Sequence, residues 1–145
     1  MVLRATDRMQ LAETQQYLID VELQPEPALD RPYGIFDGEE FAGSIGLYKI
    51  DFGNRISRIG YWIDADHQGK GLITSAARAL VDHAFNDLRL NRIEIRCAPE
   101  NAASRAVPQR LGFTEEGVHR QVLAIHGGFQ DLIMYAMLAC DWAAK

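Results

Sequence analysis

The chain has 145 residues, of which 48% are apolar and 24% charged, which predicts one globular domain over residues 1–145. Its net charge of −5 excludes the basic surface on which nucleic-acid binding depends, whereas a cationic amine is electrostatically acceptable. The cysteines and histidines show no metal-ligand spacing, and no apolar segment is long enough for a bilayer. We therefore expect a reduced, cytoplasmic protein without metal, nucleic acid or membrane anchor.

The first half of the chain predicts one helix followed by an antiparallel meander of strands. Apolar residues at roughly helical spacing predict an amphipathic helix over residues 7–23, which the three prolines of residues 24–32 cannot continue. Two strand-like runs then flank an Asp-Gly pair, which favours a hairpin, and a turn over residues 51–54 leads to a third strand. The predicted strands cover residues 33–36, 41–48 and 58–63.

The second half alternates between helical and strand-like patterns. After Gly71 the apolar residues follow a 3.6-residue repeat, which predicts a helix of about four turns that Asn91 caps. Strict alternation over residues 92–97 predicts a strand with one solvated face.

A shorter helix is predicted over residues 102–111, ending at Gly112. Pro108 removes one hydrogen bond inside this helix, so we expect a kink there. Residues 113–138, which contain a Gly-Gly turn, predict a final pair of strands. The whole pattern predicts an α/β domain with helices packed on a mostly antiparallel sheet.

Residues 59–74 carry the pattern that is most informative about chemistry. A strand leads into a glycine-rich turn and then a helix N-terminus, which gathers backbone N–H groups and the positive end of the helix dipole. Gly69 and Gly71 permit close approach of a phosphate, Lys70 adds charge and Thr74 adds a hydroxyl. An ordinary turn that caps a helix is the alternative, but this context favours anion binding. The spacing matches neither a Walker loop nor Gly-x-Gly-x-x-Gly.

Four spaced motifs follow one another in this half of the chain. They are Gln68-Gly69-Lys70-Gly71, Asn91-Arg92-Ile93-Glu94-Ile95-Arg96, Pro99-Glu100-Asn101-Ala102-Ala103-Ser104 and Arg110-Leu111-Gly112-Phe113. In this order they resemble the acetyl-CoA-binding half of the GCN5-related N-acetyltransferases (GNAT), and most of all the branch that acetylates ribosomal-protein serine and alanine. The resemblance extends from about residue 34 to residue 142. Ile73 departs from the Gly or Ala that is frequent in the superfamily, but a larger residue is familiar in this branch.

The resemblance implies a mostly antiparallel sheet in which the strand ending at residues 61–63 splays from the strand over residues 92–97. Backbone amides of residues 68–74 would hold the pyrophosphate of acetyl-CoA, and the splayed strand would pair with pantetheine. The same strand would supply an amide to the thioester oxygen, where negative charge develops. The residues assigned to acetyl-CoA on this basis are Tyr61, Trp62, Ile63, Gln68, Gly69, Lys70, Gly71, Leu72, Ile73, Thr74, Asn101 and Ser104.

Acetyl transfer needs an uncharged amine, a proton acceptor and a proton for the leaving sulfur. The resemblance implies that Asn101 bonds the pantetheine arm and that Ser104 protonates the departing thiolate. Glu100 is a candidate acceptor whose pKa partial burial could raise, with a water chain or bulk solvent as the alternative. Asn101 is also a preferred helix N-cap, and a serine in the first turn of a helix is most often merely solvated.

The resemblance therefore implies an acetyl-CoA-dependent N-acetyltransferase that works by direct transfer in a ternary complex. The expected acceptor is a protein N-terminal α-amine of the ribosomal-protein type. Two alternatives stay open, namely an acetyltransferase for a small amine such as a polyamine, amino acid or antibiotic, and a non-catalytic acyl-CoA-binding module.

Family members generally carry an additional strand and helix ahead of the segment that residues 1–23 resemble, and we expect these to be shortened or missing here. Residues 1–5 could supply a short substitute strand. Because an uncovered sheet edge exposes unpaired backbone groups, we expect a homodimer or higher oligomer that covers this edge and helps to build the acceptor channel.

Overall fold

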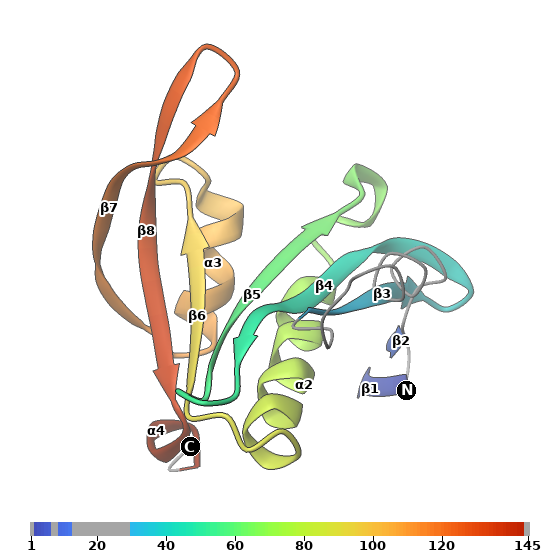
Figure 1. The fold of residues 1–145 in the computed structure, drawn as a ribbon. Helices are drawn as coiled ribbons and strands as arrows, with labels where there is room; N and C mark the ends of the chain where they lie inside the picture. Colours follow the sequence, from blue (N-terminus) through green and yellow to red (C-terminus); the bar gives the residue numbers. More distant parts are fainter. Residues whose placement is uncertain (1, 7–8, 13–29, 144–145) are drawn as a thin grey trace, which may run out of the picture.

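The computed structural model describes residues 2–6, 9–12 and 30–143, and the described strands form one sheet (Figure 1). Their order across the sheet is β1-β2-β3-β4-β5-β6-β8-β7, and every neighbouring pair except β5–β6 is antiparallel. The strands are β1 (Val2–Thr6), β2 (Met9–Ala12), β3 (Arg31–Asp37), β4 (Glu40–Asp51), β5 (Ile56–Ile63), β6 (Arg92–Cys97), β7 (Thr114–Ile125) and β8 (Gly128–Leu138). The helices are the 3₁₀ turn η1 (Ala65–His67), α2 (Leu72–Asn86), α3 (Ala102–Arg110) and α4 (Ala139–Ala143).

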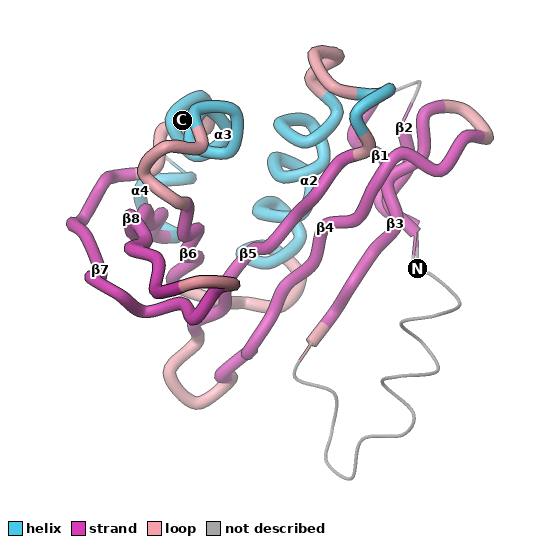
Figure 2. Tube along the Cα trace, turned by 90° about the horizontal axis from the view of Figure 1, so that it is seen from above, coloured by secondary structure: helices cyan, strands magenta, loops and turns pink. Residues whose placement is uncertain are grey.

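The predicted mixed sheet with flanking helices is confirmed. α2 and α3 lie on the same side of the sheet (Figure 2), and we call the opposite side the open face. The buried stripe of α2, which includes Ala76, Ala77 and Leu80, joins the apolar residues of β4, β5 and β6 in one core. Burial along β6 alternates as predicted, since Ile93, Ile95 and Cys97 are buried while the residues between them are half-buried.

The N-terminal prediction needs correction. Met9–Ala12 is a strand that pairs with β3, so the helix predicted over residues 7–23 is wrong there, and the rest of that prediction lies outside the described residues. β1 pairs in turn with β2 and forms the edge of the sheet, as the suggested substitute strand would. The edge of β3 is therefore covered within the chain, so a second chain is not needed to cover it.

The end of α2 also differs from the prediction. The helix ends at Asn86, and Arg89 takes a left-handed φ of 58° that turns the chain back toward the sheet. Asn91 lies beyond this reversal, where its N–H donates to the carbonyl of Arg55 at 2.7 Å and its carbonyl accepts from Ala139 at 2.9 Å. Asn91 thus joins the ends of strands and does not cap the helix.

The final hairpin confirms the predicted pair of strands. β7 is exposed along its whole length, whereas β8 is buried from Leu132 to Met137, where it pairs with β6. Gly127 has a φ of 88°, which explains the glycine in this turn. The tip of the hairpin extends beyond the other strands (Figure 1).

Candidate functional site

The sheet divides between β5 and β6. Their parallel pairing begins at Ile56 with Arg92 and ends at Ile59 with Ile95, although β5 continues to Ile63. The two strands diverge beyond this point, which we call the fork (Figure 1). The backbone of β5 after Ile59 has no partner strand on this side in the described sheet, so the predicted splayed pair is confirmed.

A cleft of about 510 Å³ lies at the fork, between the end of β5, the start of α2 and the side of α3. Its lining includes eleven of the twelve residues predicted to bind acetyl-CoA, all except Lys70. The complete lining is Tyr61, Trp62, Ile63, His67, Gln68, Gly69, Gly71, Leu72, Ile73, Thr74, Asn101, Ala103, Ser104, Ala106, Val107 and Arg110. Residues from two sequence-distant motifs thus meet in one cavity.

The turn before α2 has the features that suit a phosphate. Gly69 and Gly71 adopt φ values of 78° and 74°, a left-handed conformation that side chains disfavour. Gly71 is the N-cap of α2, no side chain caps the helix there, and its first turn contains no acidic residue. A Cβ at either glycine would meet no atom within 4 Å, so the approach to the helix N-terminus is open. These features fit the pyrophosphate of acetyl-CoA.

Lys70 is directed elsewhere. Its ammonium group lies 3.2 Å from the carboxylate of Asp37 at the end of β3, and it does not line the cleft. The ion pair offsets the charge that the sequence suggested for phosphate binding. Cofactor contacts of Lys70 are therefore not supported by its position.

On the opposite wall, Ser104 belongs to a polar cluster with Tyr61 and Cys97. The Ser104 hydroxyl lies 3.4 Å from both the Tyr61 hydroxyl and the Cys97 sulfur. The Tyr61 hydroxyl donates to the Ser104 carbonyl at 2.7 Å, and the Cys97 thiol contacts the same oxygen at 3.5 Å. Burial is the main cause that raises the pKa of Tyr61 above its ordinary value, so this phenol keeps its proton. Ser104 is thus placed at the cleft by contacts with β5 and β6.

Pro108 explains why the Ser104 carbonyl is available. A residue with an N–H at position 108 of α3 would donate to this carbonyl, four residues earlier. Proline lacks the N–H, and Tyr61 on β5 supplies the missing donor. The hydrogen bond from Tyr61 takes the place of the missing bond within the helix and connects α3 to the splayed strand β5.

The other two predicted catalytic residues lie at the start of α3. The side chain of Asn101 accepts from the N–H of Ser104 at 3.0 Å, so the helix-cap alternative is confirmed, while Asn101 also lines the cleft. Glu100 is exposed and is not part of the cleft lining. The partial burial expected for Glu100 was wrong, because the residue lies in the solvated turn before the helix.

Sequence reasoning did not assign roles to several residues that line the cleft. Arg110 contributes a cation from the last turn of α3, and its place in the Arg-Leu-Gly-Phe motif was the available signal. His67 is buried, with its Nε2 3.0 Å from a Glu40 carboxylate oxygen. Its neighbours in sequence predicted only a turn, and no local pattern pointed to Glu40, 27 residues earlier.

Within residues 2–6, 9–12 and 30–143, no group of three or more His, Cys, Asp or Glu side chains could hold a metal ion. No helix in the same ranges is long and apolar enough to cross a membrane.

Comparison with known proteins supports the interpretation of the cleft. A protein of Bacillus subtilis (strain 168) named "Putative ribosomal N-acetyltransferase YdaF" is 45% identical over 111 residues, 77% of this chain and 60% of that protein. The ribosomal-protein-serine acetyltransferase of Escherichia coli (strain K12) is 36% identical over 104 residues, 72% of this chain and 58% of that protein. The chain thus spans about 60% of the length of these two relatives.

A solved structure and a family model extend the comparison. RimL, a ribosomal L7/L12 alpha-N-protein acetyltransferase in its apo form, has a TM-score of 0.85 at 26% identity, covering 96% of this chain and 98% of that chain. The model of the acetyltransferase (GNAT) domain matches residues 2–114. Because this match includes the fork, the glycine turn and the start of α3, the chain belongs to the GNAT acetyltransferase family.

Proposed function

We propose that this protein is an acetyl-CoA-dependent N-acetyltransferase that acts on a protein N-terminal α-amine of the ribosomal-protein type. The observation that carries the proposal is the cleft at the fork, where an uncapped helix N-terminus and Ser104 face the same cavity. Family membership supports acetyl transfer as the reaction.

In this proposal the chain holds acetyl-CoA at two places. Backbone N–H groups of residues 68–74 bind the pyrophosphate, helped by the dipole of α2. The unpaired edge of β5 between Gly60 and Ile63 binds the amide groups of pantetheine in the manner of an added strand. When bound, acetyl-CoA supplies an activated acetyl group as a thioester.

Transfer forms a bond between the amine nitrogen and the acetyl carbon and breaks the bond between that carbon and sulfur. Ser104 donates its hydroxyl proton to the departing sulfur and regains a proton from solvent. The attacking amine releases its proton to solvent through water, because Glu100 is exposed and does not line the cleft. Glu100 as the acceptor stays a prediction. No covalent intermediate on the chain is required.

The proposed acceptor class follows the names that the relatives carry. The relatives at 45% and 36% identity are named for ribosomal proteins, and so is RimL. A small amine remains the alternative acceptor, and a non-catalytic acyl-CoA-binding module remains the alternative to an enzyme. The Ser104 cluster favours an enzyme, since a binding module has no need for a proton donor at this place.

Thiol release from acetyl-CoA tests the proposal with three kinds of acceptor. We expect release with peptides that copy ribosomal-protein N-termini, and little release with spermidine or with peptides whose N-terminus is already acetylated. Faster release with spermidine than with any free peptide would support the small-amine alternative. Binding of acetyl-CoA without release for any amine would support the binding module.

We also propose a homodimer, now for a different reason. The β7–β8 hairpin exposes five large apolar side chains on the described surface, an unusual concentration for a monomer. They are Val118 (54% exposed), Val122 (45%), Leu123 (45%), Ile125 (46%) and Phe129 (68%). Light scattering at micromolar concentration should report two chains per particle, and an active monomer would contradict this. A cytoplasmic location stays a prediction.

A further inference from the structure

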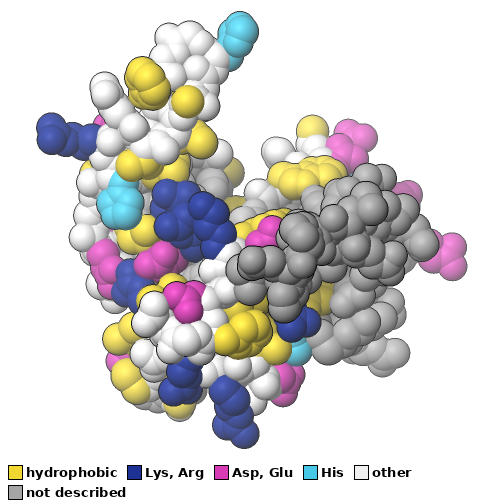
Figure 3. All heavy atoms as spheres, viewed as in Figure 1, with side chains coloured by type: hydrophobic (Ala, Val, Ile, Leu, Met, Phe, Trp, Pro, Cys, Tyr) yellow, Lys and Arg dark blue, Asp and Glu magenta, His cyan; other side chains and the backbone are white. Residues whose placement is uncertain are grey.

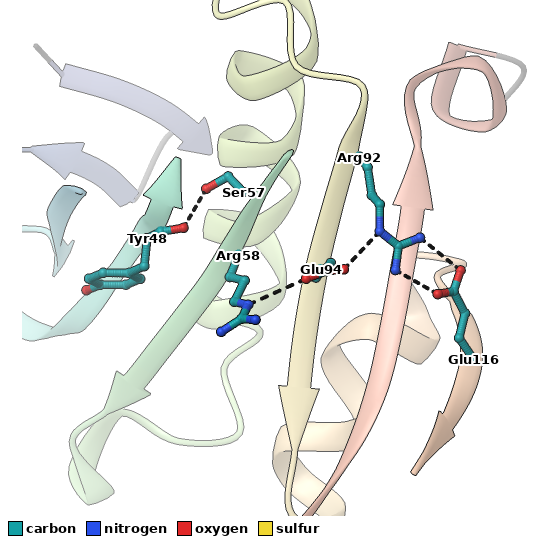
Figure 4. A network of polar contacts seen from close by, with 6 residues as sticks. All are labelled: Tyr48, Ser57, Arg58, Arg92, Glu94 and Glu116. Atoms are coloured by element: carbon teal, nitrogen blue, oxygen red, sulfur yellow. Dashed lines mark hydrogen bonds and ion pairs between the residues drawn. The ribbon is translucent and has the colours of Figure 1, made fainter. Parts of the chain in front are cut away.

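The open face of the sheet carries a row of alternating charges. Arg58 on β5 lies 3.5 Å from Glu94 on β6, and Arg92 lies 2.9 Å from the same carboxylate. Arg92 also makes a bidentate pair with Glu116 on β7, at 2.7 and 3.1 Å (Figure 4). The side chains lie in front of the sheet in this view, with helices behind it. Two arginines and two glutamates therefore neutralise one another.

Arg96 continues this row without a partner. It follows Glu94 by two residues on β6, so its side chain leaves the same face of the strand. In the described part of the chain it makes no hydrogen bond or ion pair. Burial and, after it, the neighbouring charge of Arg58 lower the pKa of Arg96, while Glu94 acts in the opposite direction. The guanidinium is half-buried near a second cation and near a carboxylate that Arg58 and Arg92 already pair with, so a bound anion would improve its environment.

The position of Arg96 relates it to the reaction centre. The last residue of β6 that pairs with β5 is Ile95, so Arg96 is the first residue of β6 beyond the fork. Figure 3 views this face and shows basic side chains gathered near its centre. An anion bound by Arg96 would lie next to the opening between β5 and β6, on the face opposite α2 and α3.

Across the fork from Arg96, the open face of β5 and β4 carries glycines and aromatic side chains. Gly60 pairs across strands with Gly46, and the Tyr48 ring covers both, because a Cβ at Gly60 would lie 3.2 Å from a ring carbon. Two residues further along β5, Trp62 is 51% exposed and lines the cleft. Its indole packs edge-to-face on Phe41 at 5.8 Å. These residues give the β5 side of the fork an aromatic surface that extends to the cleft at Trp62.

The dimensions favour a chain over a single amino acid. From Gly60 to Trp62 an extended strand advances about 7 Å, which is also the length of two residues in an extended peptide. A ligand that follows β5 from Gly60 to Trp62 therefore spans about two residues of an extended peptide. Aromatic walls suit such a peptide, whereas a polyamine would place positive charge beside Arg96.

We propose that Arg96 binds a carboxylate side chain near the N-terminus of the acceptor peptide, so that acceptors with an early Asp or Glu are preferred. This inference rests on the proposed N-acetyltransferase function and names its substrate class. Arg96 contributes to acceptor specificity through the guanidinium, while the chemistry at the fork stays with Ser104 and the backbone. A hydrogen-bonded charge pair of this kind changes specificity by about tenfold or more.

Peptide pairs of equal length that differ only in Asp against Asn, or Glu against Gln, within the first four positions test this directly. For the wild-type enzyme we expect kcat/KM to be about tenfold higher for the acidic member of at least one pair, mostly through KM. Arg96→Gln should remove the preference by lowering kcat/KM for the acidic peptide alone. Arg96→Glu should reverse the preference. Arg78→Gln, at an exposed position of α2, changes the net charge equally and should preserve the preference.

The possible results separate this inference from the proposed function. Acetylation of all peptides without any acidic preference would overturn the role of Arg96 and leave the N-acetyltransferase assignment standing. An equal loss on both members of a pair in Arg96→Gln would also overturn it, since a structural residue behaves in this way. If free aspartate were acetylated as efficiently as the acidic peptide, the carboxylate would not have to belong to a peptide, and that part of the inference would be overturned. Failure to acetylate any amine would overturn the proposed function itself.

Discussion

Replacing Tyr61 by phenylalanine tests whether the splayed strand holds α3 through the Ser104 carbonyl. The change removes the hydroxyl that donates to this carbonyl at 2.7 Å and leaves the aromatic ring in place. A buried acceptor that loses its partner costs about 1–3 kcal/mol. The Cys97 thiol still contacts the oxygen at 3.5 Å, but sulfur is a weak donor. We therefore expect the free energy of unfolding to fall by about 1–2 kcal/mol.

A double-mutant cycle with Pro108→Ala identifies the partner. Alanine at this position restores an N–H four residues after Ser104, which can donate to the same carbonyl. Tyr61→Phe should therefore cost less in the Pro108→Ala background, with a coupling energy of about 1 kcal/mol. Any general effect of removing a proline from the helix is present on both sides of the comparison and cancels.

Urea unfolding followed by circular dichroism measures all four proteins, because their slopes against denaturant should be equal if the same surface is exposed. Thermal unfolding provides a second measure, with about 4 °C expected for each kcal/mol in a domain of this size. If Tyr61→Phe destabilises the protein equally in both backgrounds, the hydroxyl acts through some other group, and the account of how α3 is held is wrong.

Three further predictions concern the cleft. Gly71→Val should weaken acetyl-CoA binding about tenfold or more, or roughly 1.4 kcal/mol, in calorimetry; Gly38→Val, at a similar φ of 66° in the β3–β4 turn, controls for backbone strain and should bind normally. Ser104→Ala should lower kcat about 10²-fold with acetyl-CoA affinity retained, and full turnover would mean that another group protonates the thiolate. Asn101→Ala should lower the free energy of unfolding by about 1 kcal/mol while Asn101→Asp should not, and equal loss in both would argue against the N-cap role.

Much of the fold around the cleft follows from local pattern. The alternation of β6, the helical repeat after Gly71 and the left-handed glycines all depend on residues within one or two turns of each other. The end of α3 is equally local, because Gly112, at a φ of 80°, closes the helix with bonds from its own N–H and that of Phe113. These features were predictable because no distant segment determines them.

The features that the sequence did not predict depend on distant partners. Met9–Ala12 is a strand because β3 is beside it, which overrides a helical spacing read from few residues. The backbone of Asn91 forms hydrogen bonds with Arg55 and Ala139, which lie next to strands of the sheet, and not with the end of α2. The bond from Tyr61 to Ser104 joins residues 43 positions apart. Lys70 pairs with the carboxylate of Asp37, 33 positions earlier in the chain, and no sequence motif indicates this pair.

The order of strands also has a consequence for the synthesis of the protein. β6 is paired with β5 over only four residue pairs but with β8 over its entire length, and β8 follows β6 by 30 residues. The wall that carries Ser104 therefore lacks its main lateral support on a nascent chain until β8 has left the ribosome. A chain halted after β7 should keep the glycine turn yet fail to organise the fork, so the capacity to react arrives late in synthesis, well after the phosphate-binding turn has been made.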